Sequence, residues 1–292
     1  MKEGQTINRR SVAIIAFVAA AAALAAIFLS IRPIAAWRLP AMPIRIGSVG
    51  VQGISFAQGK SAARTLPATG VREVQIDAPL GSVALSTMAA SSIHLHWTVP
   101  GSPDQAVRTA LQDGVLTIHF QPQGNVVNFG ANVNHLDVTI PGGLSVSAQI
   151  DAGAMSVQGD FSNLSATLQA GALNVQNFRG ALTAHDSMGA INVQQATITG
   201  PLSLTADMGA ISFAGDPGLA ATVRADMGAV DLAISPHGRL TVQGSVQMGQ
   251  FSSAFPGLRR GGGGSFSGTV GQGKPGYLNV SDQMGPVSID QF

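Results

Sequence analysis

The sequence predicts an all-β fold, a β-solenoid or β-roll-like stack of two-strand repeats of about 20 residues, plus one N-terminal transmembrane helix. Three observations predict it. Glycine-centred units recur at near-constant spacing in the second half of the chain, apolar and polar residues alternate on both sides of each glycine, and an uncharged apolar run lies near the N-terminus. Strict alternation is typical of half-buried strands, and a fixed period is typical of repeat architectures.

The apolar run extends from Ser11 to Ile31, 21 residues without a charge. As a helix rising about 1.5 Å per residue it is roughly 31 Å long, enough to cross a hydrocarbon core about 30 Å thick. Trp37 follows where an interfacial aromatic anchor is expected. A cleaved signal peptide is the alternative, although its apolar stretch is usually about 7–15 residues long.

We expect four segments: a cytoplasmic tail over residues 1–10, the transmembrane helix over 11–31, a linker or lead-in strand over 32–70, and an exported β-repeat domain over 71–292. Three basic residues precede the helix and three follow it, so their balance decides little about orientation. The ten-residue tail ends in two arginines, which favours its retention in the cytoplasm. The expected location is the bacterial cytoplasmic membrane, with the C-terminal domain on the periplasmic or extracellular side.

Composition excludes several classes of function. The chain has 292 residues and no cysteine, which excludes disulfides, thiolate zinc sites, iron–sulfur clusters and cysteine nucleophiles. Hydrophobic residues make up 45% and charged residues 11%, which excludes a disordered chain. Residues 46–292 carry 10 basic and 14 acidic groups, a net charge of −4, which argues against nucleic-acid binding.

Seven units share a small residue or methionine, then a glycine, then alternating apolar positions. Their glycines are 18, 18, 20, 19, 21 and 36 residues apart. The phase of the alternation changes at the glycine, so we expect the chain to bend there, since glycine has no Cβ. Neighbouring units would stack through main-chain hydrogen bonds, about 4.8 Å apart. The glycines are Gly153, Gly171, Gly189, Gly209, Gly228, Gly249 and Gly285, and Gly81 lies in a similar, isolated unit.

The repeats do not occupy the whole domain. Residues 71–150 also alternate, but less regularly, and predict irregular strands before the repeats of residues 151–292. Residues 256–276 interrupt the repeats with Gly261–Gly264 and further glycines and prolines. This composition predicts a flexible inserted loop, which accounts for the spacing of 36 residues.

Three features of residues 71–292 carry a family resemblance. Val74–Asp77 leads into the Gly81 unit, the strand and turn Leu136–Leu144 precede the repeats, and the repeats read glycine, small, apolar, any residue, apolar. In these features the segment resembles the bacterial "putative adhesin" family of β-strand-repeat domains. The resemblance implies an envelope domain behind one membrane helix, and it brings no catalytic residues with it.

Five methionines recur at the position before the repeat glycine. Soft thioether sulfur suits Cu(I), so stacked methionines are a candidate copper site. Each methionine is also in phase with the inward leucines and alanines of its strand, so we expect these side chains to fill gaps in the core. The five are Met188, Met208, Met227, Met248 and Met284.

A polar column flanks that position. Asp207 and Asp226 would lie on adjacent turns, about 5 Å apart, where two carboxylates can bind Ca²⁺ or serve a glycosidase. The chain has only two tryptophans and one tyrosine to hold a sugar. An aspartate before a turn usually bonds to its own backbone, so we expect local turn hydrogen bonds. The column is Asp151, Gln169, Ser187, Asp207, Asp226, Gln247 and Gln283.

The remaining motifs are weak. His94 and His96 share one face of a strand and His119 could join them, but a four-ligand metal set is not evident, so we expect surface or half-buried histidines. The run from Gly268 to Lys274 nearly spells a phosphate-binding loop, but a proline replaces the Ser or Thr that binds Mg²⁺. No Ser–His–Asp set stands out. We therefore expect no catalytic, cofactor-binding or metal-binding residues, no cofactor and no enzyme activity.

The sequence thus predicts a non-enzymatic, membrane-anchored envelope protein that displays a β-repeat domain for adhesion, scaffolding or partner binding. One alternative is an envelope-stress or ligand sensor that acts through a membrane partner; another is a polysaccharide-active solenoid enzyme. The expected partners are the membrane and an envelope protein or polysaccharide, but not nucleic acid. Exposed strands at the ends of a stack also offer a route to self-association.

Overall fold

The chain divides into two units, and the computed structural model describes the second, Gly59–Phe292, apart from residues 123–133. In this part of the chain the regular elements are β-strands, joined by two three-residue 3-10 segments, η1 (Pro103–Gln105) and η2 (Gly262–Gly264). The prediction of a nearly all-β domain is therefore confirmed. The helix that we predict over residues 11–31 lies outside the described residues, and within residues 59–122 and 134–292 no helix is long and apolar enough to cross a membrane.

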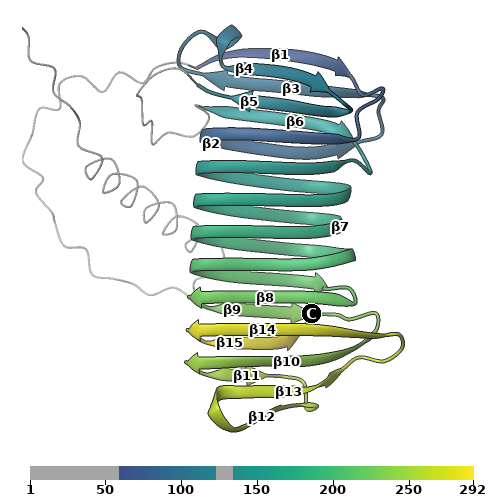
Figure 1. Ribbon diagram of the computed structural model, residues 1–292, viewed down its shortest axis with the longest axis vertical. Coiled ribbons are helices and arrows are strands. Elements are labelled where there is room, and N and C mark those ends of the chain that lie inside the picture. Colours follow the sequence, from purple (N-terminus) through teal and green to yellow (C-terminus); the bar gives the residue numbers. More distant parts are fainter. Residues whose placement is uncertain (1–58, 123–133) are drawn as a thin grey trace, which may run out of the picture. The chain divides into compact units, whose positions relative to one another are not determined.

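Parallel strands form the middle of this unit. The long element β7 (Ser145–Asp216) winds through successive turns without losing strand geometry, as Figure 1 shows between β2 and β8. Its first turn pairs in parallel with β2 (Glu73–Met88), and its last turn pairs with β8 (Ala220–Met227) and β9 (Val230–Ile234). Each turn therefore continues the hydrogen-bonded ladder of the turn before it.

The repeat glycines form the corners of these turns. Gly81 pairs in register with Gly153, and the repeat glycines of β7 (Gly153, Gly171, Gly189 and Gly209) have φ between 151° and 159°, a region that disfavours residues with a side chain. A Cβ added to Gly209 would overlap the carbonyl oxygen of Gly189 on the turn before. The predicted bend is confirmed at the repeat glycines of β7, because both the backbone angle and the spacing between turns exclude a side chain.

Alternation on each side of the corner builds the core. Leu204 and Ala206 before Gly209, and Ile211 and Phe213 after it, are fully buried, while the residues between them face outward. Every turn adds a similar set, so the interior is a column of Val, Ile, Leu and Phe side chains that continues from turn to turn. Since one turn cannot bury its own apolar face, the stability of each turn depends on its two neighbours.

The last turns do not stack in chain order. β14 (Pro275–Met284) pairs in parallel with both β8 and β10 (Arg239–Met248), and β15 (Val287–Gln291) pairs with both β9 and β11 (Phe251–Ser253). The C-terminal turn therefore lies between two turns that precede it in the sequence (Figure 1). Our expectation that sequence neighbours stack is wrong here, because all turns present the same parallel ladder and the same corner, so any of them can be neighbours.

The prediction of a flexible loop over residues 256–276 is also wrong. This segment contains β12 (Leu258–Arg260) and β13 (Ser265–Val270), which are antiparallel to each other, and β13 is antiparallel to β10. Phe266 is buried and stacks on Phe251, with 4.0 Å between the ring centroids. The glycines that suggested a loop instead let these strands pack closely, and the hairpin covers one end of the stack.

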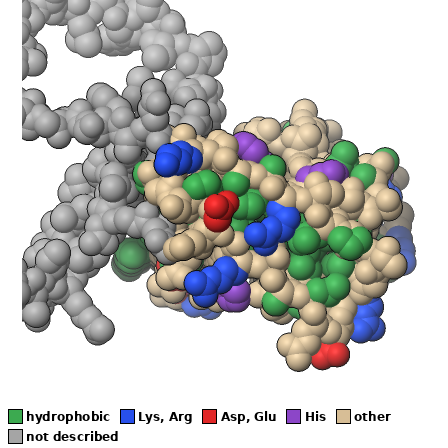
Figure 2. Space-filling model, turned by 90° about the horizontal axis from the view of Figure 1, so that it is seen from above, with side chains coloured by type: hydrophobic (Ala, Val, Ile, Leu, Met, Phe, Trp, Pro, Cys, Tyr) green, Lys and Arg blue, Asp and Glu red, His purple; other side chains and the backbone are tan. Residues whose placement is uncertain are grey.

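Antiparallel strands cover the other end, where β1 falls in the segment that we predict to be a linker or lead-in strand. Arg64 on β1 lies 5.7 Å from the centroid of the Trp97 ring and donates a hydrogen bond to Thr109 on β4 (3.0 Å). Figure 2 looks onto this end and shows basic and histidine side chains among apolar ones. Charged side chains on an edge strand discourage further strand pairing. The strands here are β1 (Lys60–Pro67), β3 (Ser92–Val99), β4 (Val107–Gln112), β5 (Val115–Phe120) and β6 (His135–Pro141).

Candidate functional site

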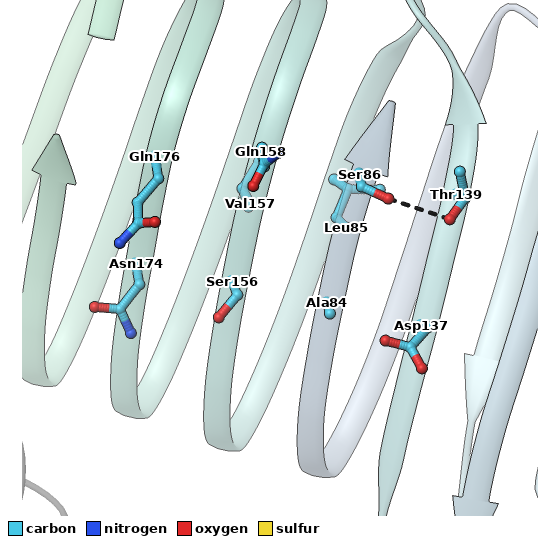
Figure 3. A pocket seen from close by; sticks show the side chains of 10 residues that line it. All are labelled: Ala84, Leu85, Ser86, Asp137, Thr139, Ser156, Val157, Gln158, Asn174 and Gln176. Atoms are coloured by element: carbon cyan, nitrogen blue, oxygen red, sulfur yellow. Dashed lines mark hydrogen bonds between the residues drawn. The ribbon is translucent and has the colours of Figure 1, made fainter. Parts of the chain in front are cut away.

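A shallow groove of about 380 Å³ crosses the outward face of β6, β2 and the first turns of β7 (Figure 3). Seven of the ten residues that line it are polar, and one carboxylate is the single charged group among them. The other polar side chains carry hydroxyls and amides, which both donate and accept hydrogen bonds. The side chains that define the groove are Ser86, Asp137, Thr139, Gln158, Asn174 and Gln176.

Parallel register aligns these side chains. Ser86 on β2 is opposite both Thr139 on β6 and Gln158 on β7, and all three point to the outward face because they share one phase of the alternation. The hydroxyls of Ser86 and Thr139 are 3.1 Å apart. On the next turns the Nδ2 of Asn192 donates to the Oδ1 of Asn174 (3.3 Å), so the polar row continues along the stack.

A hydrogen-bonded cluster fixes the carboxylate of the groove. Asp137 Oδ2 is 3.1 Å from His96 Nδ1, and Asp137 Oδ1 is 2.9 Å from His135 Nε2. The other ring nitrogen of His135, Nδ1, is 2.7 Å from Ser82 Oγ. Both oxygens of Asp137 therefore have a histidine partner.

Ser82 contacts His135 and His135 contacts Asp137, which is the sequence of contacts in a hydrolase triad. The amino-acid sequence did not predict this arrangement. The register of β2 on β6 brings Ser82 opposite His135, and no local pattern encodes that pairing. The backbone N–H of Ser82 donates to the carbonyl of Asn134 (2.9 Å), so the amide that a nucleophilic serine commonly contributes to an oxyanion hole is already used. His96 also holds the second oxygen of Asp137. The arrangement fits a cluster that positions Asp137 better than it fits a nucleophile.

The candidate metal histidines do not converge. His94 contacts the hydroxyls of Thr65 and Ser92, at 3.1 and 2.9 Å, whereas His119 lies on β5 and contacts Asp77 at 3.0 Å. Over residues 59–122 and 134–292, no group of three or more His, Cys, Asp or Glu side chains could hold a metal ion. The prediction of surface or half-buried histidines agrees with these positions.

The polar column forms hydrogen bonds across turns, and one of its members also forms an ion pair within its own strand. Gln169 donates to Asp151 (3.0 Å), Gln283 donates to Asp226 (2.9 Å), and Asp226 also forms an ion pair with Arg224 (2.9 Å). The prediction of local turn bonds is wrong for these residues. Three other aspartates make such bonds: Asp186 accepts from the backbone N–H of Met188 (3.1 Å), Asp216 from that of Gly218 (3.2 Å), and Asp282 from that of Met284 (3.0 Å).

Asp186 and Asp282 are buried carboxyl groups at the corners. The Oδ2 atoms of both have no hydrogen-bond partner among the described residues. Burial raises the pKa of Asp186 to about 6; the Met188 N–H opposes the rise and the negative charge of Asp207 adds to it. Burial also raises the pKa of Asp282; the hydrogen bond from the Met284 N–H lowers it, and the negative charge of Asp226 raises it further. The pKa of Asp231 is raised by partial burial and by Asp290.

Replacing Asp186 by asparagine is expected to change how stability depends on pH. Because the folded-state pKa of Asp186, about 6, exceeds the ordinary value of 3.8, the folded state binds more protons between these pH values. Protonated Asp186 therefore stabilises the folded state fully below pH 3.8, and this contribution is lost as the pH rises through about 6. Thermal unfolding should show Asp186→Asn melting above the wild type near pH 7.5 and close to it near pH 4.

The exposed Asp160 supplies the control for this pH series. Asp160→Asn removes the same charge from the surface and should leave the wild-type pH dependence in place. A lower melting temperature of Asp186→Asn at pH 7.5 would instead show that Asp186 is a stabilising, ionised group.

The methionine column is exposed, so the prediction that it fills the core is wrong. Met208 is 42% exposed, whereas Ala206, two residues earlier, is 1% exposed. Strict alternation would bury both. The chain rounds its corner between Ala206 and Ile211, so the phase of the strand ends before the methionine and the side chain projects from the corner.

The near phosphate-binding motif is part of a strand and the turn after it. Gly268 lies in β13, and β14 begins at Pro275, so a strand follows where the motif needs a helix. Lys274 instead lines a second groove of about 410 Å³, together with His237 and Asp216. The Nδ1 of His237 and the Oδ2 of Asp216 are 2.7 Å apart, within hydrogen-bond distance. The phosphate-loop interpretation is therefore not supported by the local structure.

No family model and no curated protein matches the chain. Among solved structures, a "putative cell adhesion protein" from Clostridium sporogenes is 11% identical, with 80% of this chain and 100% of that chain covered and a TM-score of 0.35. A "putative adhesin" from Bacteroides fragilis is 14% identical, with coverage of 80% and 97% and a TM-score of 0.34. One from Parabacteroides distasonis is 13% identical, with coverage of 80% and 98% and a TM-score of 0.27. The TM-scores of all three are below 0.5.

Proposed function

We propose that this chain is a non-enzymatic envelope protein that residues 11–31 anchor to the bacterial cytoplasmic membrane. Its exported β-solenoid displays a binding surface for an envelope polysaccharide, and so serves adhesion or scaffolding. The observation that carries the proposal is the polar groove on β6, β2 and β7, with its row of neutral hydroxyl and amide groups.

The chemistry of the groove suits a ligand rich in hydroxyls. Gln158 and Gln176 are exposed on successive turns, and their amides can donate to and accept from the same ligand. The turns repeat at about 4.8 Å, so the polar row offers similar groups at regular intervals to an extended polymer. A strongly charged ligand would need more countercharges than the single carboxylate of the groove supplies.

The groove is better suited to binding than to hydrolysis. Glycoside hydrolysis commonly uses two carboxyl groups, one of which protonates the leaving oxygen. Asp137 is the one carboxylate of the groove, and His96 and His135 hold its two oxygens. This arrangement favours the adhesion or scaffolding role over a polysaccharide-active enzyme.

A pull-down with purified envelope polysaccharide tests the proposal, using the full chain extracted from membranes. The double substitution Gln158→Ala/Gln176→Ala should weaken retention by about tenfold, because it removes two ligand hydrogen bonds worth about 0.5–1.5 kcal/mol each. Thr222→Ala, an equally exposed change on β8 outside the groove, should retain the wild-type amount.

Two results would contradict the proposal. Equal retention of the double variant and the wild type would show that the groove is not the binding surface. Release of shortened glycan fragments by the wild type would show hydrolysis instead of binding.

A further inference from the structure

Four exposed methionines lie in register on consecutive turns, and we call them the methionine ladder: Met208, Met227, Met284 and Met248. Met208 pairs with Met227, Met227 with Met284, and Met284 with Met248. Their side chains are 42%, 40%, 41% and 64% exposed, in that order. The ladder depends on the inserted C-terminal turn, which places Met284 between two methionines that precede it in the sequence.

The fold does not require methionine at this position. Leu80 and Ala152 hold the same place before their glycines on earlier turns, where they are in register with each other. Since a small or branched apolar residue completes the corner equally well, packing does not account for four methionines. What methionine adds is a flexible side chain that ends in a polarizable thioether.

We propose that the methionine ladder binds a soft monovalent metal ion, Cu(I) or its analogue Ag(I), between thioethers of adjacent turns. Thioether sulfur is a soft ligand that selects Cu(I). Adjacent parallel strands are about 4.7–4.9 Å apart, and two metal–sulfur bonds of about 2.3 Å span nearly that distance. The three rotatable bonds of methionine adjust the remaining difference.

The charges beside the ladder favour a cation and disfavour hard ions. Asp207 and Asp226 precede the first two methionines of the ladder and place two carboxylates beside it. Asp226 is engaged by Arg224 and Gln283, and Asp207 lies 3.7 Å from His185. A hard cation such as Ca²⁺ needs 6–8 oxygen ligands, which this corner does not supply. The four thioethers remain as the main ligands.

An isothermal calorimetric titration of the full chain with Ag(I) tests the ladder. Competition with a chromogenic chelator under reducing conditions tests binding of Cu(I). Replacing the four ladder methionines by leucine, together with Met188, which is 39% exposed and precedes Gly189 on the turn next to Met208, keeps the apolar surface and removes the thioethers. We expect the leucine variant to bind at least about tenfold more weakly than the wild type, with an unchanged thermal unfolding temperature. In the wild type, the methyl NMR signals of the ladder methionines should shift on addition of Ag(I).

Met88 provides the control, because it is 41% exposed and lies outside the ladder. Met88→Leu should bind Ag(I) as the wild type does. Unchanged binding by the leucine variant, or equal loss in Met88→Leu, would overturn the proposal. Equal binding of Zn²⁺ and Ag(I) by the wild type would overturn it as well, because it would show that softness does not select the ion.

Discussion

Replacing Gly209 by alanine is expected to lower the free energy of unfolding by about 3 kcal/mol or more. Gly209 has a φ of 151°, where a side chain is strained, and its Cβ would overlap the carbonyl oxygen of Gly189. Backbone on a neighbouring turn cannot move aside without breaking the ladder. Thermal unfolding followed by circular dichroism should show a melting temperature reduced by roughly 6–12 °C.

Gly262 is the matched control for this substitution. A Cβ at Gly262 meets nothing within 4 Å, and its φ is not in the strained region. Gly262→Ala should therefore melt close to the wild type. Equal melting temperatures of Gly209→Ala and Gly262→Ala would mean that the corners tolerate side chains. In that case the turns would be spaced more widely than the contact between Gly209 and Gly189 indicates.

Removing residues 275–292 is expected to abolish cooperative folding. The deletion takes away β14 and β15, whose buried side chains Leu278, Val280, Val287 and Ile289 are each at most 2% exposed. Burying each such side chain contributes about 1.5–3 kcal/mol, so the loss is comparable to the whole stability of a typical protein, about 5–15 kcal/mol. Size-exclusion chromatography and denaturant unfolding should show aggregated protein without a single sharp transition.

A shorter deletion separates this effect from a general sensitivity of the C-terminus. Phe292 is 59% exposed, and removing it alone takes away one hydrogen bond, from its N–H to the carbonyl of Ile234. That variant should unfold like the full chain. If the long deletion also unfolded sharply at the wild-type midpoint, β10 would have to pair directly with β8, and the inserted turn would be dispensable.

Local patterns predicted the turns of this protein but not their order. Alternation around Gly209, with Leu204 and Ile211 inward, follows from the period of a strand and from the absence of a Cβ at the corner. The insertion of β14 between β8 and β10 could not be predicted, because each turn carries the same pattern and pairing depends on the path of the connections. The loop predicted around Gly268 is wrong for a related reason. Glycine favours both mobile loops and tightly paired strands, and sequence alone does not separate them.

The candidate site was less predictable than the fold. Ser82 and His135 are 53 residues apart and meet only through the register of two strands. Met208 was misplaced because the period-two pattern stops at the corner, one residue before the side chain in question. The polar residues of the groove, such as Gln158, look like any outward position of a strand, and only the stacking of turns brings them together.

The position of β14 and β15 has a consequence for how the protein matures. During synthesis β10–β13 emerge from the ribosome before β14, and at that time β8 and β10 have no strand between them. Both present open parallel edges with matching corners, so direct pairing of β8 with β10 competes with the native order until the final turn arrives. Completion of the stack therefore requires a late insertion step, and such non-local pairing is intrinsically slow. We expect a slow refolding phase that reports the insertion of β14 and β15, whereas the turns of β7 should form in a faster phase.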